Sequence, residues 1–223
     1  MSALFLRRSL PRGRRSGRST GSGFLGAPAP LPANVNAFRQ GLRENGYVEG
    51  RNLLIGWRSA EGQEERLSGL AAELLRLNVA VIVTEGPSAA LAAKNATAVT
   101  PIVFTFVSDP VGLGIVASLA RPGGNITGLA NLGLELTAKR VQLLKEAIPS
   151  LSVVMLTDPA NPMSAPTLKE AQIAARRLGL EVSLVEVRHS SELEPALAKS
   201  AHKRTLAMTV QRSRSVRVLD YER

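Results

Sequence analysis

The sequence predicts an α/β protein in which a parallel sheet is flanked by helices, and three observations support this. Residues 79–83 and 101–107 are short apolar runs rich in β-branched side chains, which are typical of strands buried in a parallel sheet. An alanine-rich segment that opens at Ser88 lies between them and predicts a helix. Strand and helix alternate along most of the chain, which predicts right-handed βαβ units and a Rossmann-like lobe.

The elements of the first half follow from the same patterns. Asn34 is a suitable N-cap for an amphipathic helix, and Asn45 with Gly46 is a suitable end for it. A second amphipathic helix precedes the run at 79–83. The expected strands are residues 23–26, 52–58, 79–83, 101–107 and 125–129, and the expected helices are residues 34–47, 61–77, 88–98 and 111–119.

The second half begins with a long helical segment at 134–148, followed by a strand at 153–156, a helix at 167–178 and a strand at 180–187. After about residue 200 the alternation fails. A sheet begun at Val153 would then have only two strands, too few for independent stability. We therefore expect most of a second lobe to be missing. The expected organisation is a disordered basic segment (1–22), a first α/β lobe (23–130), a crossover helix (131–150), a partial second α/β lobe (151–200) and an irregular tail (201–223).

The net charge of +10 would suit a nucleic-acid-binding protein, but its distribution argues against that function. Residues 1–18 hold six arginines and no acidic residue, and residues 202–223 hold six basic and two acidic residues. These two ends carry the whole excess of positive charge, so basic and acidic residues are equal in number between them. No nucleic-acid partner is expected.

Catalytic and metal-binding motifs are missing from the sequence. There is no cysteine, and His189 and His202 make no metal-spaced pair, so no metal or cofactor is expected. No Ser-His-Asp set, GxSxG motif or phosphate-binding glycine loop occurs, which argues against an enzyme. No apolar run approaches the ~20 residues needed to cross a bilayer, so no transmembrane segment is expected.

Polar residues gather at the ends of two neighbouring predicted strands: Thr84 and Ser88 after the first, and Thr105, Ser108 and Asp109 after the second. In an open α/β sheet, ligands bind beyond the carboxyl ends of the strands, where helix N-termini present free N–H groups. Ser88 either caps its helix or holds an anionic group of a ligand. Asp109 with its neighbours either ends a strand or meets the ligand, and its charge would match a ligand ammonium group.

A third turn of this kind follows the strand at 153–156 and carries Asp158, Asn161 and Ser164. These residues could contribute to a ligand site from an opposing lobe. Asn161-Pro162 is also a strong turn signal, so turn formation is the simpler interpretation.

Three segments carry a resemblance to a known family: AFRQGLRENGYVEGRNLLIGWRSAEGQEERLSGLAAELLRLNVAVIVTEG, PSAALAAKNATAVTPIVFTFVSDPVGLGIVASLARPGGNITGL and ELTAKRVQLLKEAIP. Together they resemble the bacterial ABC transporter substrate-binding proteins related to the tryptophan/tyrosine-binding type. The resemblance spans about residues 23–198 and implies the type I periplasmic-binding fold. Both ends depart from the family: the Arg-rich segment stands where an export signal and an intact first strand are expected, and the chain stops before most of the second lobe.

The resemblance also implies a function and a set of ligand residues. It implies a binding protein without enzymatic activity that closes two lobes on a small organic ligand, such as an aromatic or other amino acid, and delivers it to a permease. It implies a periplasmic or membrane-surface location, whereas the chain as given, without a recognisable export signal, would stay in the cytoplasm. The alternative is an α/β enzyme or a cytosolic sensor that uses the same cleft. By position, the implied ligand residues are Ala27, Pro28, Gly86, Pro87, Ser88, Thr105, Ser108, Asp109, Asp158 and Asn161, with Pro162 beside them.

Overall fold

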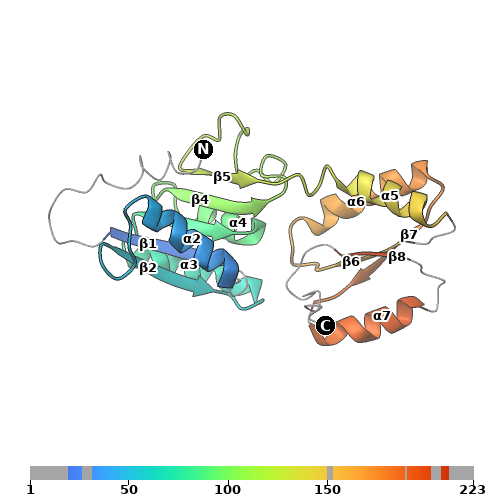
Figure 1. The fold of residues 1–223 in the computed structure, drawn as a ribbon, viewed down its shortest axis with the longest axis horizontal. Helices are drawn as coiled ribbons and strands as arrows, with labels where there is room; N and C mark the ends of the chain where they lie inside the picture. Colours follow the sequence, from blue (N-terminus) through green and yellow to red (C-terminus); the bar gives the residue numbers. More distant parts are fainter. Residues whose placement is uncertain (1–19, 27–31, 150–152, 189, 202–206, 211–223) are drawn as a thin grey trace. The chain divides into compact units, whose positions relative to one another are not determined.

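The computed structural model describes residues 20–26, 32–149, 153–188, 190–201 and 207–210. The chain divides into two compact units, residues 1–131 and 132–223. Each unit has its own parallel sheet with helices on both faces (Figure 1). The predicted α/β architecture is confirmed.

The first unit is built on a five-stranded parallel sheet with the strand order β2-β1-β3-β4-β5. Each predicted apolar run in this unit forms a strand, because burial on both faces of a parallel sheet favours continuous β-branched runs. The elements are β1 (Thr20–Gly26), α2 (Pro32–Glu44), β2 (Leu53–Ser59), the 3-10 helix η1 (Glu64–Arg66), α3 (Leu67–Arg76), β3 (Val81–Glu85), α4 (Pro87–Ala96), β4 (Ile102–Val107) and β5 (Ile126–Ala130).

The side chains of β1 alternate between the two faces of this sheet. Leu25 packs in the core cluster that includes Leu74 of α3 and Ala90 of α4. Phe24 points the other way, where its ring centroid lies 5.9 Å from that of Phe38 in α2. The helix α2 therefore covers one face, and α3 with α4 covers the opposite face.

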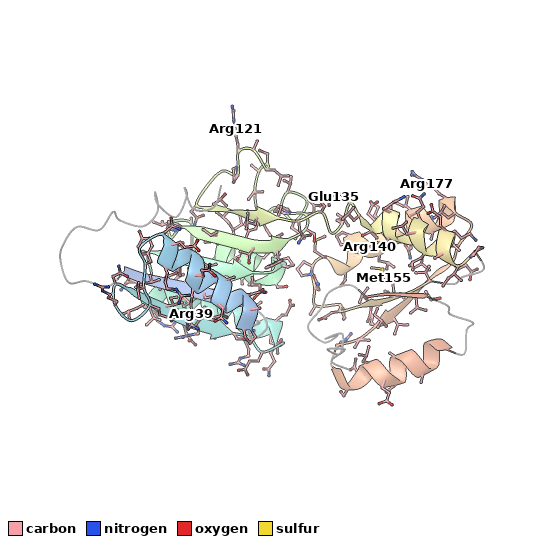
Figure 2. All side chains as sticks on the ribbon, in the orientation of Figure 1. Arg39, Arg121, Glu135, Arg140, Met155 and Arg177 are labelled. Carbon is pink, nitrogen blue, oxygen red and sulfur yellow. The ribbon has the colours of Figure 1, made fainter. Side chains whose placement is uncertain are left out.

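An aromatic cluster joins α2 to the neighbouring strands β1 and β2 on its face of the sheet. The Phe24 and Trp57 ring centroids are 4.9 Å apart, and Phe38 meets Trp57 edge to face at 6.2 Å. The guanidinium of Arg39, labelled on α2 in Figure 2, lies 5.3 Å from the centroid of the Trp57 ring. Such a cation–π contact and aromatic pairs stabilise the packing beyond the area they bury.

The first strand is longer than the sequence predicts, since β1 has seven residues and pairs with both β2 and β3. The expectation of a truncated strand at 23–26 and of a basic segment reaching residue 22 is therefore corrected. Glycine fits closely here, because a Cβ on Gly23 would lie 3.0 Å from Leu74 Cδ1 and a Cβ on Gly56 would lie 3.1 Å from Leu74 Cδ2, so that the leucine side chain would have to shift by a few tenths of an ångström. The low strand propensity of this glycine-rich stretch concealed the strand in the sequence.

The second unit holds a three-stranded parallel sheet with the order β7-β6-β8. Met155 of β6, labelled in Figure 2, is buried with side chains of α5 and α6, whereas Leu156 packs toward α7 on the opposite face. The strand β8 corrects the expectation of two strands and an irregular segment after residue 200. The elements are α5 (Thr137–Ala147), β6 (Val153–Thr157), α6 (Ser164–Arg177), β7 (Val182–Glu186), the 3-10 helix η2 (Ser190–Glu192), α7 (Leu193–Ala201) and β8 (Ala207–Val210).

Two details of the helices differ from the sequence prediction. Asn34 is not an N-cap, because α2 begins at Pro32. Residues 111–119 form turns instead of a helix: Leu113 N–H donates to the carbonyl of Asp109, and Gly114 has a left-handed φ of 66°. The apolar pattern of that segment reflects burial of Ile115 and Val116 in the core, and not a helical face.

Candidate functional site

The strand order of the first unit marks one place for a ligand. The chain leaves β1 toward β2 and later continues on the other side at β3, so the order reverses between β1 and β3. Ligands of doubly wound sheets bind at such a switch point, beyond the carboxyl ends of the strands. There Gly26 pairs with Glu85, and Glu85 pairs with Thr105. We call the ends of β1, β3 and β4 the carboxyl edge.

Backbone and hydroxyl groups bind β3 and β4 together at the carboxyl edge. The N–H of Gly86 donates to the carbonyl oxygen of Thr105 at 2.9 Å. The Thr105 hydroxyl in turn donates to the carbonyl oxygen of Thr84 at 3.0 Å. These bonds fix the turn that leads into α4, and they leave the Thr105 oxygen able to accept a further hydrogen bond.

The turn Gly86-Pro87-Ser88 presents the start of α4 at this edge. Gly86 is the N-cap with a left-handed φ of 87°, which favours glycine, and Pro87 takes the first helical position. Ser88 is therefore the second helical residue and not the cap. Its half-buried side chain has no hydrogen bond within the described part of the chain. The role of Ser88 as a ligand residue remains a prediction.

Ser108 and Asp109 follow β4 and are engaged with their own surroundings. The Ser108 hydroxyl donates to Asn131 Oδ1 at 2.7 Å, which links the ends of β4 and β5. Asp109 Oδ1 accepts the N–H of Gly112 at 2.8 Å. These bonds give both residues a structural role, and their contact with a ligand remains a prediction.

Sequence reasoning missed Glu85, the last residue of β3. One carboxylate oxygen, Oε1, accepts a hydrogen bond from Asn34 Nδ2 of α2 at 3.3 Å. The other, Oε2, is buried and has no hydrogen-bond partner in the described part of the chain, and the same holds for the hydroxyl of the fully buried Thr84. An acidic residue directly after a buried apolar run, at the centre of the sheet, was the available signal.

A second irregularity at this edge is Phe106, which interrupts β4 before its last residue. Its φ of 57° is left-handed, an uncommon conformation for a bulky side chain. The register of β4 against β5 shifts between Phe104 and Val107, so the strand carries a β-bulge there. The bulge leaves the Phe106 side chain about half exposed. Neither the bulge nor the exposed ring was predicted.

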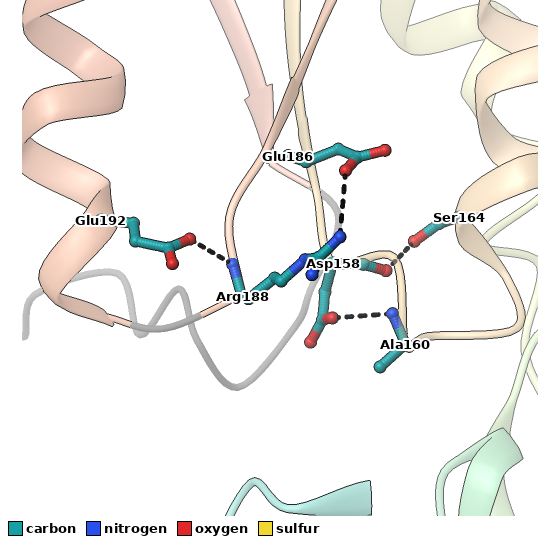
Figure 3. Close-up of polar contacts among 6 residues, drawn as sticks. All are labelled: Asp158, Ala160, Ser164, Glu186, Arg188 and Glu192. Carbon is teal, nitrogen blue, oxygen red and sulfur yellow. Dashed lines mark hydrogen bonds and ion pairs between the residues drawn. The ribbon is translucent and has the colours of Figure 1, made fainter.

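In the second unit, Asp158, drawn in Figure 3, and Asn161 shape the turn from β6 into α6. Asp158 Oδ1 accepts the N–H of Ala160 at 3.0 Å, and the Ser164 hydroxyl donates to the Asp158 carbonyl oxygen at 2.5 Å. Asn161 Oδ1 accepts the N–H of Met163 at 2.9 Å. Ser164 is the first residue of α6, three residues before the predicted start. The ligand contacts of Asp158 and Asn161 remain a prediction.

The neighbouring strand end carries Arg188, which sequence reasoning also missed. The backbone N–H of Arg188 donates to Glu192 Oε2 at 2.8 Å, and a nitrogen of its guanidinium group lies 3.9 Å from Glu186 Oε2 (Figure 3). Because Thr157 pairs with Glu186, the turns that hold Asp158 and Arg188 follow adjacent strands. A basic side chain thus accompanies Asp158 at the carboxyl ends of β6 and β7.

Two hollows in the first unit lie away from the predicted ligand residues. One, of about 430 Å³, is lined mainly by Trp57, Arg58, Arg66 and Glu73 beside β2, and another, of about 220 Å³, lies between Arg39 and Glu49. Neither is lined by a predicted ligand residue. Ala27 and Pro28 fall outside the described residues, as do residues 1–19 and 211–223.

The described ranges contain neither a metal-binding cluster nor a membrane-spanning helix. No group of three or more His, Asp or Glu side chains in those ranges could hold a metal ion. Among the same residues, no helix combines the length and the apolar character that a bilayer crossing requires.

Solved structures share this fold. A conserved domain protein from Vibrio cholerae is 28% identical, with a TM-score of 0.74 over 84% of this chain and 64% of its own. An ABC domain from Streptococcus pneumonia in complex with L-Trp is 22% identical, with a TM-score of 0.77 over 89% of this chain and 67% of its own. A leucine binding protein from Thermotoga maritima aligns with a TM-score of 0.66 at 14% identity. The fold is that of the type I periplasmic-binding proteins.

The family follows from the sequence comparison. The model of the family "ABC transporter substrate binding protein" matches residues 24–217, and the chain belongs to this family. A tyrosine-binding protein of Clostridioides difficile (strain R20291) is 29% identical over 162 residues, which is 72% of this chain. The chain spans 46% of the length of that curated relative.

Proposed function

We propose that this chain is the solute-binding component of an ABC importer and that its ligand is an amino acid. In this proposal the protein acts outside the cytoplasmic membrane and delivers the ligand to a permease in that membrane. Membership of the substrate-binding family supports a binding role without catalysis. The tyrosine-binding relative and the L-Trp complex favour an amino acid, aromatic ones first. The observation that carries the proposal is the set of polar groups at the switch point between β1 and β3.

The start of α4 is the place we assign to the ligand carboxylate. Pro87 has no N–H, and Ala90 N–H donates to the Gly86 carbonyl. The N–H groups of Ser88 and Ala89 and the Ser88 hydroxyl therefore remain for an anion. The positive end of the α4 dipole adds to their attraction. Thr105, Ser108 and Asp109 would surround the rest of the ligand from the end of β4.

The remaining predicted ligand residues complete the proposed site. Asp158 and Asn161 would contribute from the second unit, and Ala27 with Pro28 from the loop after β1. In this proposal residues 23–130 form the first lobe, residues 131–150 the crossover and residues 151–200 part of the second lobe. Closure of two lobes on a ligand is the usual way in which hinged binding proteins exclude water from it.

A thermal-shift screen of the 223-residue chain against the twenty amino acids tests the proposal. A ligand present at 100 times its dissociation constant adds about 2.7 kcal/mol to the free energy of unfolding. For a chain of this size the expected rise in Tm is about 5–10 °C. No shift with any amino acid would overturn the proposal, and chemical conversion of a bound amino acid, followed by NMR, would favour an enzyme instead.

A further inference from the structure

We propose that Glu85 binds the ammonium group of the amino-acid ligand. This inference rests on the proposed function and deepens it, because it names the group that would distinguish an amino acid from other carboxylic acids. It is carried by two independent observations: the position of Glu85 in the sheet, and a buried carboxylate oxygen that has no donor among the residues the structure describes.

The position of Glu85 is the switch point itself. It ends the central strand β3 and pairs with Gly26 on one side and Thr105 on the other. By the alternation of side chains along β3, Glu85 projects to the same face as Val81 and Val83, the face that α2 covers. Its hydrogen bond with Asn34 of α2 agrees with that placement. Neighbouring strands lie about 5 Å apart, so the Thr105 hydroxyl is within reach of the same ligand atom.

Among the described residues, none carries a positive charge paired with Glu85. Oε1 receives one long hydrogen bond, at 3.3 Å from the neutral amide of Asn34, and Oε2 receives none from those residues. Within the described ranges, Glu85 takes part in no ion pair, whereas Glu49, Glu61, Glu73 and Glu186 each face an arginine. A buried, unsatisfied carboxylate oxygen costs free energy, and an N–H donor from a ligand would recover it.

An ammonium group suits the Glu85 carboxylate better than a metal ion does. A metal site needs several ligands, and the described residues offer no group of three acidic or histidine side chains. An ammonium group has three N–H donors, and two of them could bond to Glu85 Oε2 and to the Thr105 hydroxyl oxygen. Asp109 was the ammonium partner predicted from sequence; like Glu85 it has one oxygen that accepts a hydrogen bond, but among the described residues only Glu85 has a second carboxylate oxygen that is buried without a partner. Glu85 also lies beside α4, whose N–H groups would hold the carboxylate of the same ligand.

The test compares amino acids with their counterparts that lack the amino group. The wild-type chain and the variant Glu85→Gln are titrated by calorimetry with L-tyrosine, L-tryptophan, 3-(4-hydroxyphenyl)propionate and 3-(indol-3-yl)propionate, and with the other eighteen amino acids. Glutamine keeps the acceptor for Asn34 and removes only the charge. We expect Glu85→Gln to weaken amino-acid binding roughly 10- to 100-fold, since a hydrogen bond to a charged group has about that effect. Binding of the two propionates should stay within about twofold.

Two control variants separate a ligand contact from a structural effect. Glu44→Gln removes the charge of an exposed glutamate at the end of α2 and should leave all affinities unchanged. Asn34→Ala keeps the Glu85 carboxylate and should keep the preference for the amino group. If Glu85→Gln weakens amino acids and propionates equally, or weakens neither, the role of Glu85 is overturned while the proposed function stands. If the wild-type chain binds none of the twenty amino acids, both proposals fail.

Discussion

Asp109 and Gly112 fit together in a single tight turn at the end of β4. Asp109 Oδ1 accepts the N–H of Gly112 at 2.8 Å, and a Cβ on residue 112 would lie only 2.0 Å from Asp109 Oδ2. The carboxylate thus occupies the space that the missing side chain leaves. The turn holds the segment in which Ile115 and Val116 enter the core.

Replacing Asp109 by Ala should lower the free energy of unfolding by about 1 kcal/mol, because the Gly112 N–H loses its acceptor. Asp109→Asn keeps an acceptor oxygen and should cost less than half as much. Urea unfolding of the two variants and the wild type measures this difference. Equal losses for Asn and Ala would mean that the charge, and not the hydrogen bond, stabilises the turn.

Glycine at position 128 is required by the backbone of the neighbouring strand. A Cβ there would lie 2.1 Å from the Phe104 carbonyl oxygen and 2.6 Å from Phe104 Cγ. Gly128→Ala should therefore destabilise the first unit by about 3 kcal/mol, since neither the backbone of β4 nor the buried ring can yield cheaply. Thermal unfolding checks the magnitude.

Gly69 provides the matched control, because it is exposed on α3 with nothing near its Cβ position. Gly69→Ala should stabilise the chain by about 0.5–1 kcal/mol through the higher helix propensity of alanine. If Gly128→Ala were as well tolerated as Gly69→Ala, the close packing of β5 on β4 would be refuted.

Ser88→Ala should weaken amino-acid binding and leave stability within about 0.5 kcal/mol of the wild type. The Ser88 hydroxyl has no partner in the described part of the chain, so its removal breaks no internal bond. Calorimetry with L-tyrosine and L-tryptophan measures the affinity, and urea unfolding measures the stability. Unchanged affinity for an amino acid that the wild type binds would exclude Ser88 from the site.

The stability of the chain should depend on Glu49 at acidic pH. The hydrogen bond from Arg39 Nε, at 2.6 Å, lowers the pKa of the Glu49 carboxyl below its ordinary 4.5; burial opposes this, and the Trp57 indole donor and the Arg39 charge reinforce it. A carboxyl with a lower pKa in the folded chain stabilises it above the unfolded pKa. That contribution is lost as the pH falls through the folded-state pKa.

The measurement is urea unfolding of the wild type and Glu49→Gln between pH 7 and pH 3. The difference in unfolding free energy should be constant from pH 7 to about pH 5 and should shrink below about pH 4.5. A difference that stayed the same down to pH 3 would show that the Glu49 charge does not contribute. High salt should reduce the difference at neutral pH, because the pair is partly exposed.

The sequence predicts the buried strands well, because a parallel sheet selects continuous β-branched runs such as residues 101–107. It predicts β1 poorly, since the glycine and serine residues of Thr20–Gly26 give no strand signal. Gly23 fits in the strand because Leu74 of α3 packs directly against it, and this contact is not visible in the sequence. The helix expected at 111–119 is wrong for a similar reason. Its apolar spacing comes from turns that bury two residues, which only the tertiary structure specifies.

For the candidate site, the sequence locates the strand ends, but it does not show which polar side chains already have hydrogen-bond partners within the protein. Turn residues such as Gly86 and Ser88 are visible because glycine, proline and serine mark the end of a buried run. Whether Asp109 or Glu85 has an unsatisfied oxygen depends on hydrogen bonds to Gly112 and Asn34. The partner Asn34 lies 51 residues from Glu85, and no local pattern predicts such a contact.

The packing of Leu74 against Gly23 and Gly56 limits which substitutions the sheet tolerates. A Cβ would lie 3.0 Å from Leu74 Cδ1 at position 23 and 3.1 Å from Leu74 Cδ2 at position 56, so one leucine side chain constrains residues on two neighbouring strands. Any larger residue at either position would have to displace that side chain, and mutations at positions 23 and 56 should therefore be energetically coupled through Leu74.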